Sequence, residues 1–310
     1  MSGTDRIRAG AAVAVAAALA LALAGCGLGA GSAPIGVSLL VTQGFGARTV
    51  TATSKPKIVG ADTVMRMLER NARVATAFGG GFVSRIDGVA GAGTSDWFYY
   101  VNGVQAPKGA AETRLHNGDH VWWDRHDWRA AESIPAVVGA FPEPFMDGYN
   151  GKHLPLRIEC TGHARSTCNA VQSVFAGYDL VASEGCLLCS TANQTLRVVV
   201  GPYDTLKADP GATLLARAPS ASGVYARFED GGRRLALLDA AGATVRTAGA
   251  GAGLIAAIRW MGQPPAWYVT GTDAAGVAAA VRAFDAPTLD DHFAIAVLGD
   301  VAIPLPDGER

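Results

Sequence analysis

Four cysteines in the second half of the chain, Cys160, Cys168, Cys186 and Cys189, have the residue type for redox or metal chemistry. Four cysteines allow three disulfide pairings, and the short loops favour Cys160–Cys168 with Cys186–Cys189, although spacing does not settle connectivity. A thioredoxin-like redox centre needs Cys-x-x-Cys at the start of a helix, whereas residues 183–191 are polar and loop-like. A four-thiolate zinc site is the third alternative, but the first pair is spaced too widely for a zinc knuckle. We predict structural disulfides and no metal.

Histidines and aspartates recur between positions 116 and 127, where a metal ion is a natural hypothesis. The set comprises His116, Asp119, His120, Asp124, His126 and Asp127. With the two-residue period of a strand, His120 and Asp124 lie on one face, and His126 follows loosely. The chain contains no His-Glu-x-x-His motif, and no second ligand pair is fixed by a helix. Solvated strand ends are therefore the simpler interpretation.

Aromatic side chains are concentrated between positions 97 and 128 of a chain that is only 7% aromatic. Along the predicted strand 96–101 they alternate between two faces, so one face fills a core and the other is free for a planar or apolar ligand. We predict ligand contacts at Trp97, Tyr99, Asn102 and Trp123. The competing interpretation is that the aromatic residues only stabilise a small β domain.

Motifs for catalysis are absent from the sequence. The segment Val269–Asp273 ends a predicted strand and begins a helix, where α/β domains bind ligands and where anions are favoured. The alternative is that Thr272 or Asp273 caps the helix. No Gly-x-Ser-x-Gly elbow occurs, and no Gly-x-Gly-x-x-Gly loop follows a strand. We predict that the protein is not an enzyme and has no cofactor.

The first 26 residues have the pattern of an export signal. Arg6 and Arg8 precede an apolar run over 9–24, which leads into Leu23-Ala24-Gly25-Cys26. A basic start, an apolar centre and small residues before a cleavage point form a secretory signal. The run is short for the ~20 residues that span a bilayer, although a signal-anchor helix is an alternative. The last four residues resemble a bacterial lipobox, which implies a signal peptide over 1–25 and a diacylglyceryl group on Cys26. We expect the mature protein on the extracytoplasmic face of the cell membrane.

The rest of the 310-residue chain is long enough for two domains. A net charge of −1 gives no electrostatic reason to expect nucleic acid as a partner. We predict a flexible tether over 26–36, a first domain over 37–130, a linker over 131–152 and a second domain over 153–310.

In the first domain, the patterns predict two strands, a helix over 62–71 and three further strands, the order of a β-grasp domain. Two hairpin-type dipeptides, Asn102-Gly103 and Asn117-Gly118, separate the later strands. In the second domain, strands alternate with helices over 168–176 and 274–284, which predicts a small α/β domain with parallel pairing. The predicted class is thus an α+β β-grasp-like domain followed by an α/β domain.

Three blocks of the first domain carry a family resemblance: residues 82–89, the run Trp97–Gly103, and Gly118–Trp123. They resemble a domain family of unknown function that is similar to the C-terminal domain of transcobalamin and intrinsic factor, in the soluble-ligand-binding β-grasp group. The resemblance implies a β-grasp fold and a corrinoid-like or other planar organic ligand. The helical domain that holds the other side of the corrinoid in transcobalamins is not visible in this sequence.

Together these patterns predict a lipoprotein that binds a ligand without enzymatic activity. Its expected partners are membrane lipid, through Cys26, a small planar ligand and a membrane transporter. The alternative is a structural or protein-interaction protein of the cell envelope, and an envelope enzyme acting at Thr270–Asp273 is the third possibility.

Overall fold

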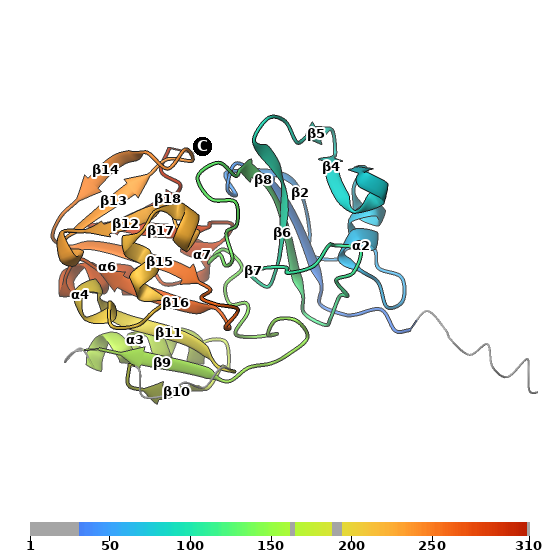
Figure 1. Ribbon diagram of the computed structural model, residues 1–310. Helices are drawn as coiled ribbons and strands as arrows, with labels where there is room; N and C mark the ends of the chain where they lie inside the picture. Colours follow the sequence, from blue (N-terminus) through green and yellow to red (C-terminus); the bar gives the residue numbers. More distant parts are fainter. Residues whose placement is uncertain (1–30, 162–164, 188–193, 309–310) are drawn as a thin grey trace, which may run out of the picture.

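The computed structural model describes residues 31–161, 165–187 and 194–308. It is a mixed α/β protein, mostly sheet with few helices (Figure 1). This composition is compatible with the predicted α+β class. The predicted signal peptide, Cys26 and Cys189 lie outside the described residues. In the described part of the chain, no helix is both long enough and apolar enough to cross a membrane.

The first domain is built on a five-stranded sheet in the order β2-β1-β8-β6-β7. The strands are β1 (Ser38–Gln43), β2 (Arg48–Thr53), β6 (Ser95–Val101), β7 (Val104–Gln105) and β8 (His120–Asp127). The neighbours β1 and β8 are parallel, whereas the other pairs are antiparallel. Strands β3 (Val74–Ala77), β4 (Phe82–Ile86) and β5 (Val89–Ala90) form a separate small sheet.

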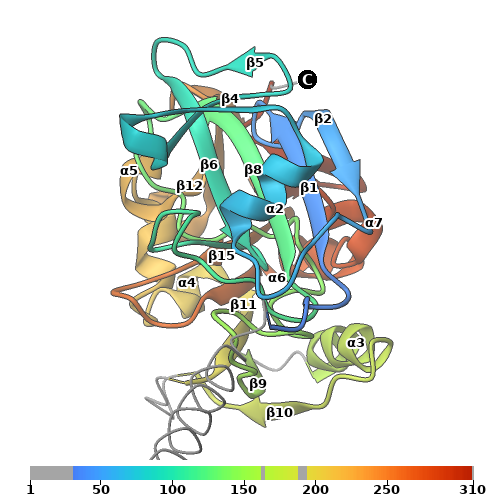
Figure 2. The ribbon, with the colours of Figure 1, turned by 90° about the vertical axis from the view of Figure 1, so that its right-hand side faces the viewer.

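Helix α2 (Val64–Asn71) covers one face of this sheet (Figure 2). It begins after Thr63, whose hydroxyl accepts a hydrogen bond from the Arg66 amide and so caps a free N–H group of the first turn. Val64, Met65, Met67 and Leu68 are buried against the sheet. The predicted helix over 62–71 is confirmed with a start two residues later.

The second domain contains a seven-stranded sheet in the order β10-β9-β11-β16-β15-β17-β18. These strands are β9 (Leu156–Cys160), β10 (Ala182–Gly185), β11 (Leu196–Pro202), β15 (Ala252–Ile258), β16 (Ala266–Gly271), β17 (Ala294–Leu298) and β18 (Val301–Leu305). From β10 to β16 the pairing is parallel, as predicted, and from β16 to β18 it is antiparallel. Every residue of β15 is buried in the sheet.

Two layers cover this larger sheet. Helices α3 (Arg165–Ala176) and α6 (Ala274–Arg282) pack on one face. On the other face lies a three-stranded sheet of β12 (Ala226–Glu229), β13 (Arg234–Leu238) and β14 (Thr244–Ala248), with short helices α4 (Tyr203–Leu206) and α5 (Pro219–Ser222). Helix α7 (Ala286–Leu289) follows α6.

The two domains share one hydrophobic core. Tyr100 and Trp122, on the sheet face opposite α2, pack with Phe293 of the second domain. The Phe293 ring centroid lies 5.6 Å from that of Tyr100 and 5.1 Å from that of Trp122. The predicted linker takes part in this packing, because Ile134 and Val137 are buried in the same cluster. Both faces of the first sheet are therefore covered, one by α2 and one by the second domain.

Candidate functional site

The three aromatic residues predicted to contact a ligand lie in the core beneath α2. Trp97, Tyr99 and Trp123 are 6%, 9% and 3% exposed. The Tyr99 and Trp123 rings stack at 4.8 Å, and the Tyr99 hydroxyl donates to the Lys108 carbonyl at 2.6 Å. This burial favours the competing interpretation that the aromatic residues stabilise the domain.

Asn102, the fourth predicted contact, is completely buried and fully bonded. It has φ 53° and precedes Gly103 in the β6–β7 turn. Its Nδ2 donates to the Gly148 carbonyl at 2.6 Å and to Asp119 at 3.3 Å, and its Oδ1 accepts from the His120 amide at 2.7 Å. The side chain thus ties the turn to β8 and to the segment that leads into the second domain.

The predicted Cys160–Cys168 disulfide is present, with a Cα–Cα distance of 6.1 Å, and joins the end of β9 to α3. Cys186 is also disulfide-bonded. Its pairing with Cys189 stays a prediction, because Cys189 lies outside the described residues.

At the start of α6, Asp273 accepts hydrogen bonds from the Gly276 amide at 2.8 Å and the Gly251 amide at 2.9 Å. Both carboxylate oxygens are used by backbone donors, one of which belongs to the first turn of the helix. The geometry matches the capping alternative at this segment.

A cluster of buried charges lies inside the second domain. Arg197 donates to Glu159 at 2.6 and 3.2 Å and also to Asp209, and the Tyr268 hydroxyl donates to Asp209 at 2.8 Å. Burial opposes the charge on Asp209, but these hydrogen bonds and the Arg197 charge hold its pKa below the usual value. Each charge has its partner within the cluster, so we assign it a structural role.

The interpretation of the 116–127 stretch as solvated strand ends was wrong for its central residues. Asp119, Asp124 and His126 are only 2%, 0% and 3% exposed. Burial lowers the pKa of His120, against the opposing charge of Asp290. Apolar neighbours at the same period, above all Trp122, were the signal that this face is buried. Within the described residues, no three His, Cys, Asp or Glu side chains are placed to hold a metal ion.

Asp124 and His126 form a hydrogen-bonded pair on β8. The His126 Nδ1 lies 2.8 Å from an Asp124 oxygen. Asp124 also accepts from the Thr42 hydroxyl at 2.5 Å and from the amides of Phe45 and Gly46 at 3.1 and 2.9 Å. Because four donors surround this buried carboxylate, its position is fixed, and it fixes the imidazole in turn.

The His126 ring is also held by aromatic packing. It stacks between Phe45 and Phe98, with centroid distances of 4.8 and 4.5 Å, and meets the Phe293 ring at 5.4 Å. Its Nε2 makes no hydrogen bond to the described residues, and this atom is not fully buried. We conclude that Nε2 reaches the adjoining pocket.

This pocket, which we call the junction pocket, has a volume of about 460 Å³, within the range of small-ligand sites. It is lined by the β1–β2 turn, the ends of β6 and β8, and the β13–β14 turn, so both domains form it. Arg129 pairs with Asp127 at 2.7 Å, whereas Arg48 makes no ion pair with the described residues. An oriented imidazole and a free guanidinium thus face one cavity.

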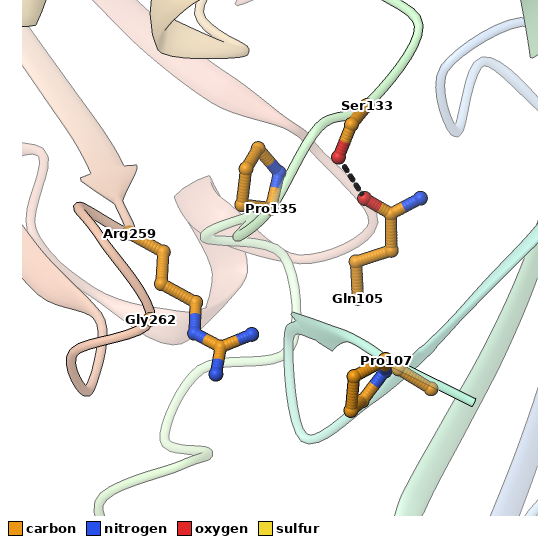
Figure 3. Close-up of a pocket in the computed structure, with 7 residues that line it drawn as sticks. Gln105, Pro107, Ser133, Pro135, Arg259 and Gly262 are labelled. Atoms are coloured by element: carbon orange, nitrogen blue, oxygen red, sulfur yellow. Dashed lines mark hydrogen bonds between the residues drawn. The ribbon is translucent and has the colours of Figure 1, made fainter.

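A second pocket, which we call the Arg259 pocket, has a volume of about 380 Å³ and also lies between the domains (Figure 3). Its lining residues come from the end of β7, the segment before residue 136 and the β15–β16 turn: Gln105, Ala106, Pro107, Ser133, Pro135, Arg259 and Gly262. The Ser133 hydroxyl donates to Gln105 Oε1 at 2.6 Å.

Comparison with known proteins places one family on the first domain. Residues 61–127 match the family described as "Domain of unknown function (DUF4430)". This match agrees with the predicted resemblance to a domain family of unknown function. No curated protein matches the chain. A solved structure described as a "putative metal binding protein" from Ruminococcus gnavus is similar to 29% of this chain and 95% of its own, with 17% identity and a TM-score of 0.25. A likeness this low carries no functional argument.

Proposed function

We propose that this protein is a lipid-anchored, extracytoplasmic binding module without enzymatic activity, and that its ligand binds in the junction pocket. The observation that carries the proposal is the Asp124–His126 pair, whose buried imidazole is fixed on every side except at Nε2. A polar atom held this rigidly beside a cavity favours recognition of a ligand group, because little side-chain entropy is lost on binding.

The geometry also suggests the kind of ligand. The Asp124 carboxylate can only accept a hydrogen bond from the Nδ1 of His126. This favours the tautomer in which Nδ1 carries the proton and Nε2 is free to accept a hydrogen bond from a ligand. Arg48 adds donors and a positive charge at the rim. We infer a small polar ligand with a hydroxyl or N–H donor and an anionic end. The planar ligand implied by the transcobalamin resemblance would require the aromatic core to open.

We also infer a β-grasp fold for the first domain. Its support is the order β2-β1-β8-β6, with a central parallel pair and a helix on one face. The lipobox at Cys26 supports membrane attachment, and a membrane transporter is the partner that would receive the ligand.

The test is native mass spectrometry of the mature chain, purified from the cell envelope of the organism that makes it. The wild type is expected to retain a small molecule, and His126→Phe is expected to lose it, since phenylalanine preserves the ring stacking and removes Nε2. His116→Gln is the matched control, because the His116 side chain is 47% exposed outside the pocket. Equal retention by His126→Phe, or no retained molecule in the wild type, would refute the proposal.

A further inference from the structure

The Arg259 pocket contains a positive charge with no counter-charge. None of its lining residues is acidic, and Arg259 forms no ion pair with the described residues. An arginine beside a cavity normally has a carboxylate partner or faces solvent, because its charge is costly to bury alone. We propose that this pocket is a second binding site, separate from the junction pocket, for a small organic carboxylate.

The guanidinium is held in place before any ligand arrives. Arg259 Nε donates to the Gln263 carbonyl at 3.0 Å, and the guanidinium carbon lies 6.0 Å from the Tyr149 ring centroid. The terminal nitrogens of Arg259 make no hydrogen bond to the described residues. A planar guanidinium of this kind binds both oxygens of a carboxylate at once, a geometry that lysine cannot reproduce.

A second donor lies across the pocket. Figure 3 shows Gln105 and Ser133 on the side opposite Arg259. Because the Gln105 Oε1 accepts from Ser133 at 2.6 Å, its Nε2 is the end of the amide left to donate to a ligand. The backbone N–H of Gln105 also donates to the Pro135 carbonyl at 3.1 Å, and this bond fixes the backbone on this side of the pocket.

The remaining walls are apolar and rigid. Ala106, Pro107 and Pro135 offer no charge and lose little side-chain entropy on binding. The volume of about 380 Å³ is at the lower end of the range for small-molecule sites. The chemistry that fits is a carboxylate on a short hydrocarbon body, with the charge at Arg259 and the hydrocarbon against the prolines.

The experiment is isothermal titration of the full mature chain with benzoate and hexanoate, compared with benzamide and hexanamide. The acids are expected to bind and the amides to bind at least about tenfold more weakly, equivalent to about 1.4 kcal/mol. Arg259→Gln is expected to abolish the preference for the acids. Arg259→Lys is expected to keep the charge and lose at least about fivefold in affinity, since the two-point contact is gone.

Arg282→Gln is the matched control, because the Arg282 side chain is 61% exposed in the second domain and its ion pair among the described residues is with the exposed Asp300. Gln105→Leu is the second variant, and it should weaken binding without removing the charge. Acid binding that survives in Arg259→Gln, equal binding of acids and amides, or no acid binding up to about 10 mM overturns the proposal. Tighter binding of a peptide through its C-terminal carboxylate than of any free acid would identify a protein partner instead and overturn it as well.

Discussion

The buried carboxyl group of Glu143 predicts that stability falls as pH rises. Glu143 is 6% exposed and accepts a hydrogen bond from the Asp147 amide at 2.8 Å. Burial is the largest cause that raises its pKa, to about 8, and the charges of Asp147 and Asp119 add to it against the opposing amide bond. The folded protein therefore keeps this group protonated at pH values where the unfolded chain releases the proton.

The sign and size of the effect follow from the two pKa values. The contribution to stability is complete below pH 4.5, the unfolded value, and is lost as pH rises through about 8. Each pKa unit corresponds to about 1.4 kcal/mol, so the upper bound is about 5 kcal/mol, and we expect about 2 to 5 kcal/mol. Asp291, with its pKa raised to about 6 by burial and by Asp290, acts with the same sign at lower pH.

The assay is urea unfolding of the mature chain at pH 5, 7 and 9, with Glu143→Gln as the perturbed protein. Glutamine resembles the protonated acid, so the variant should show a flatter fall in the free energy of unfolding between pH 5 and pH 9. Glu69→Gln is the control, because Glu69 is exposed on α2 and should change nothing. Parallel pH curves for the wild type and Glu143→Gln would refute the reasoning.

Three further predictions concern packing and charge. Arg197→Met removes the ion-pair partner of the buried Asp209 and leaves Glu159 with only Arg157, at 3.5 Å, among the described residues; urea unfolding should show a loss of about 3 to 5 kcal/mol, and less than about 1 kcal/mol would contradict a structural role. Phe293→Ala should cost about 3 to 5 kcal/mol and raise hydrogen exchange in β8 as well as β17, whereas exchange confined to the second domain would mean separate cores. Cys168→Ser should lower stability by about 2 to 3 kcal/mol in calorimetry by opening a short loop, and an unchanged melting temperature would argue against that.

Local pattern was enough for features that depend on neighbours along the chain. The alternation in 96–101, the Asn102-Gly103 turn, the cap at Asp273 and the short Cys160–Cys168 loop all follow from contacts a few residues apart. Such features were predictable because backbone geometry and nearby side chains decide them.

Long-range packing decided everything about the candidate sites. The sequence showed that one face of the first sheet must be buried, but residues of the second domain, among them Phe293, cover the other face, and nothing local indicates that contact. Asp124 is bonded to Thr42 and Phe45, about 80 positions earlier in the chain, and both pockets are made from turns of different domains. A side chain's exposure depends on which distant segment packs against it, and only the tertiary structure determines that.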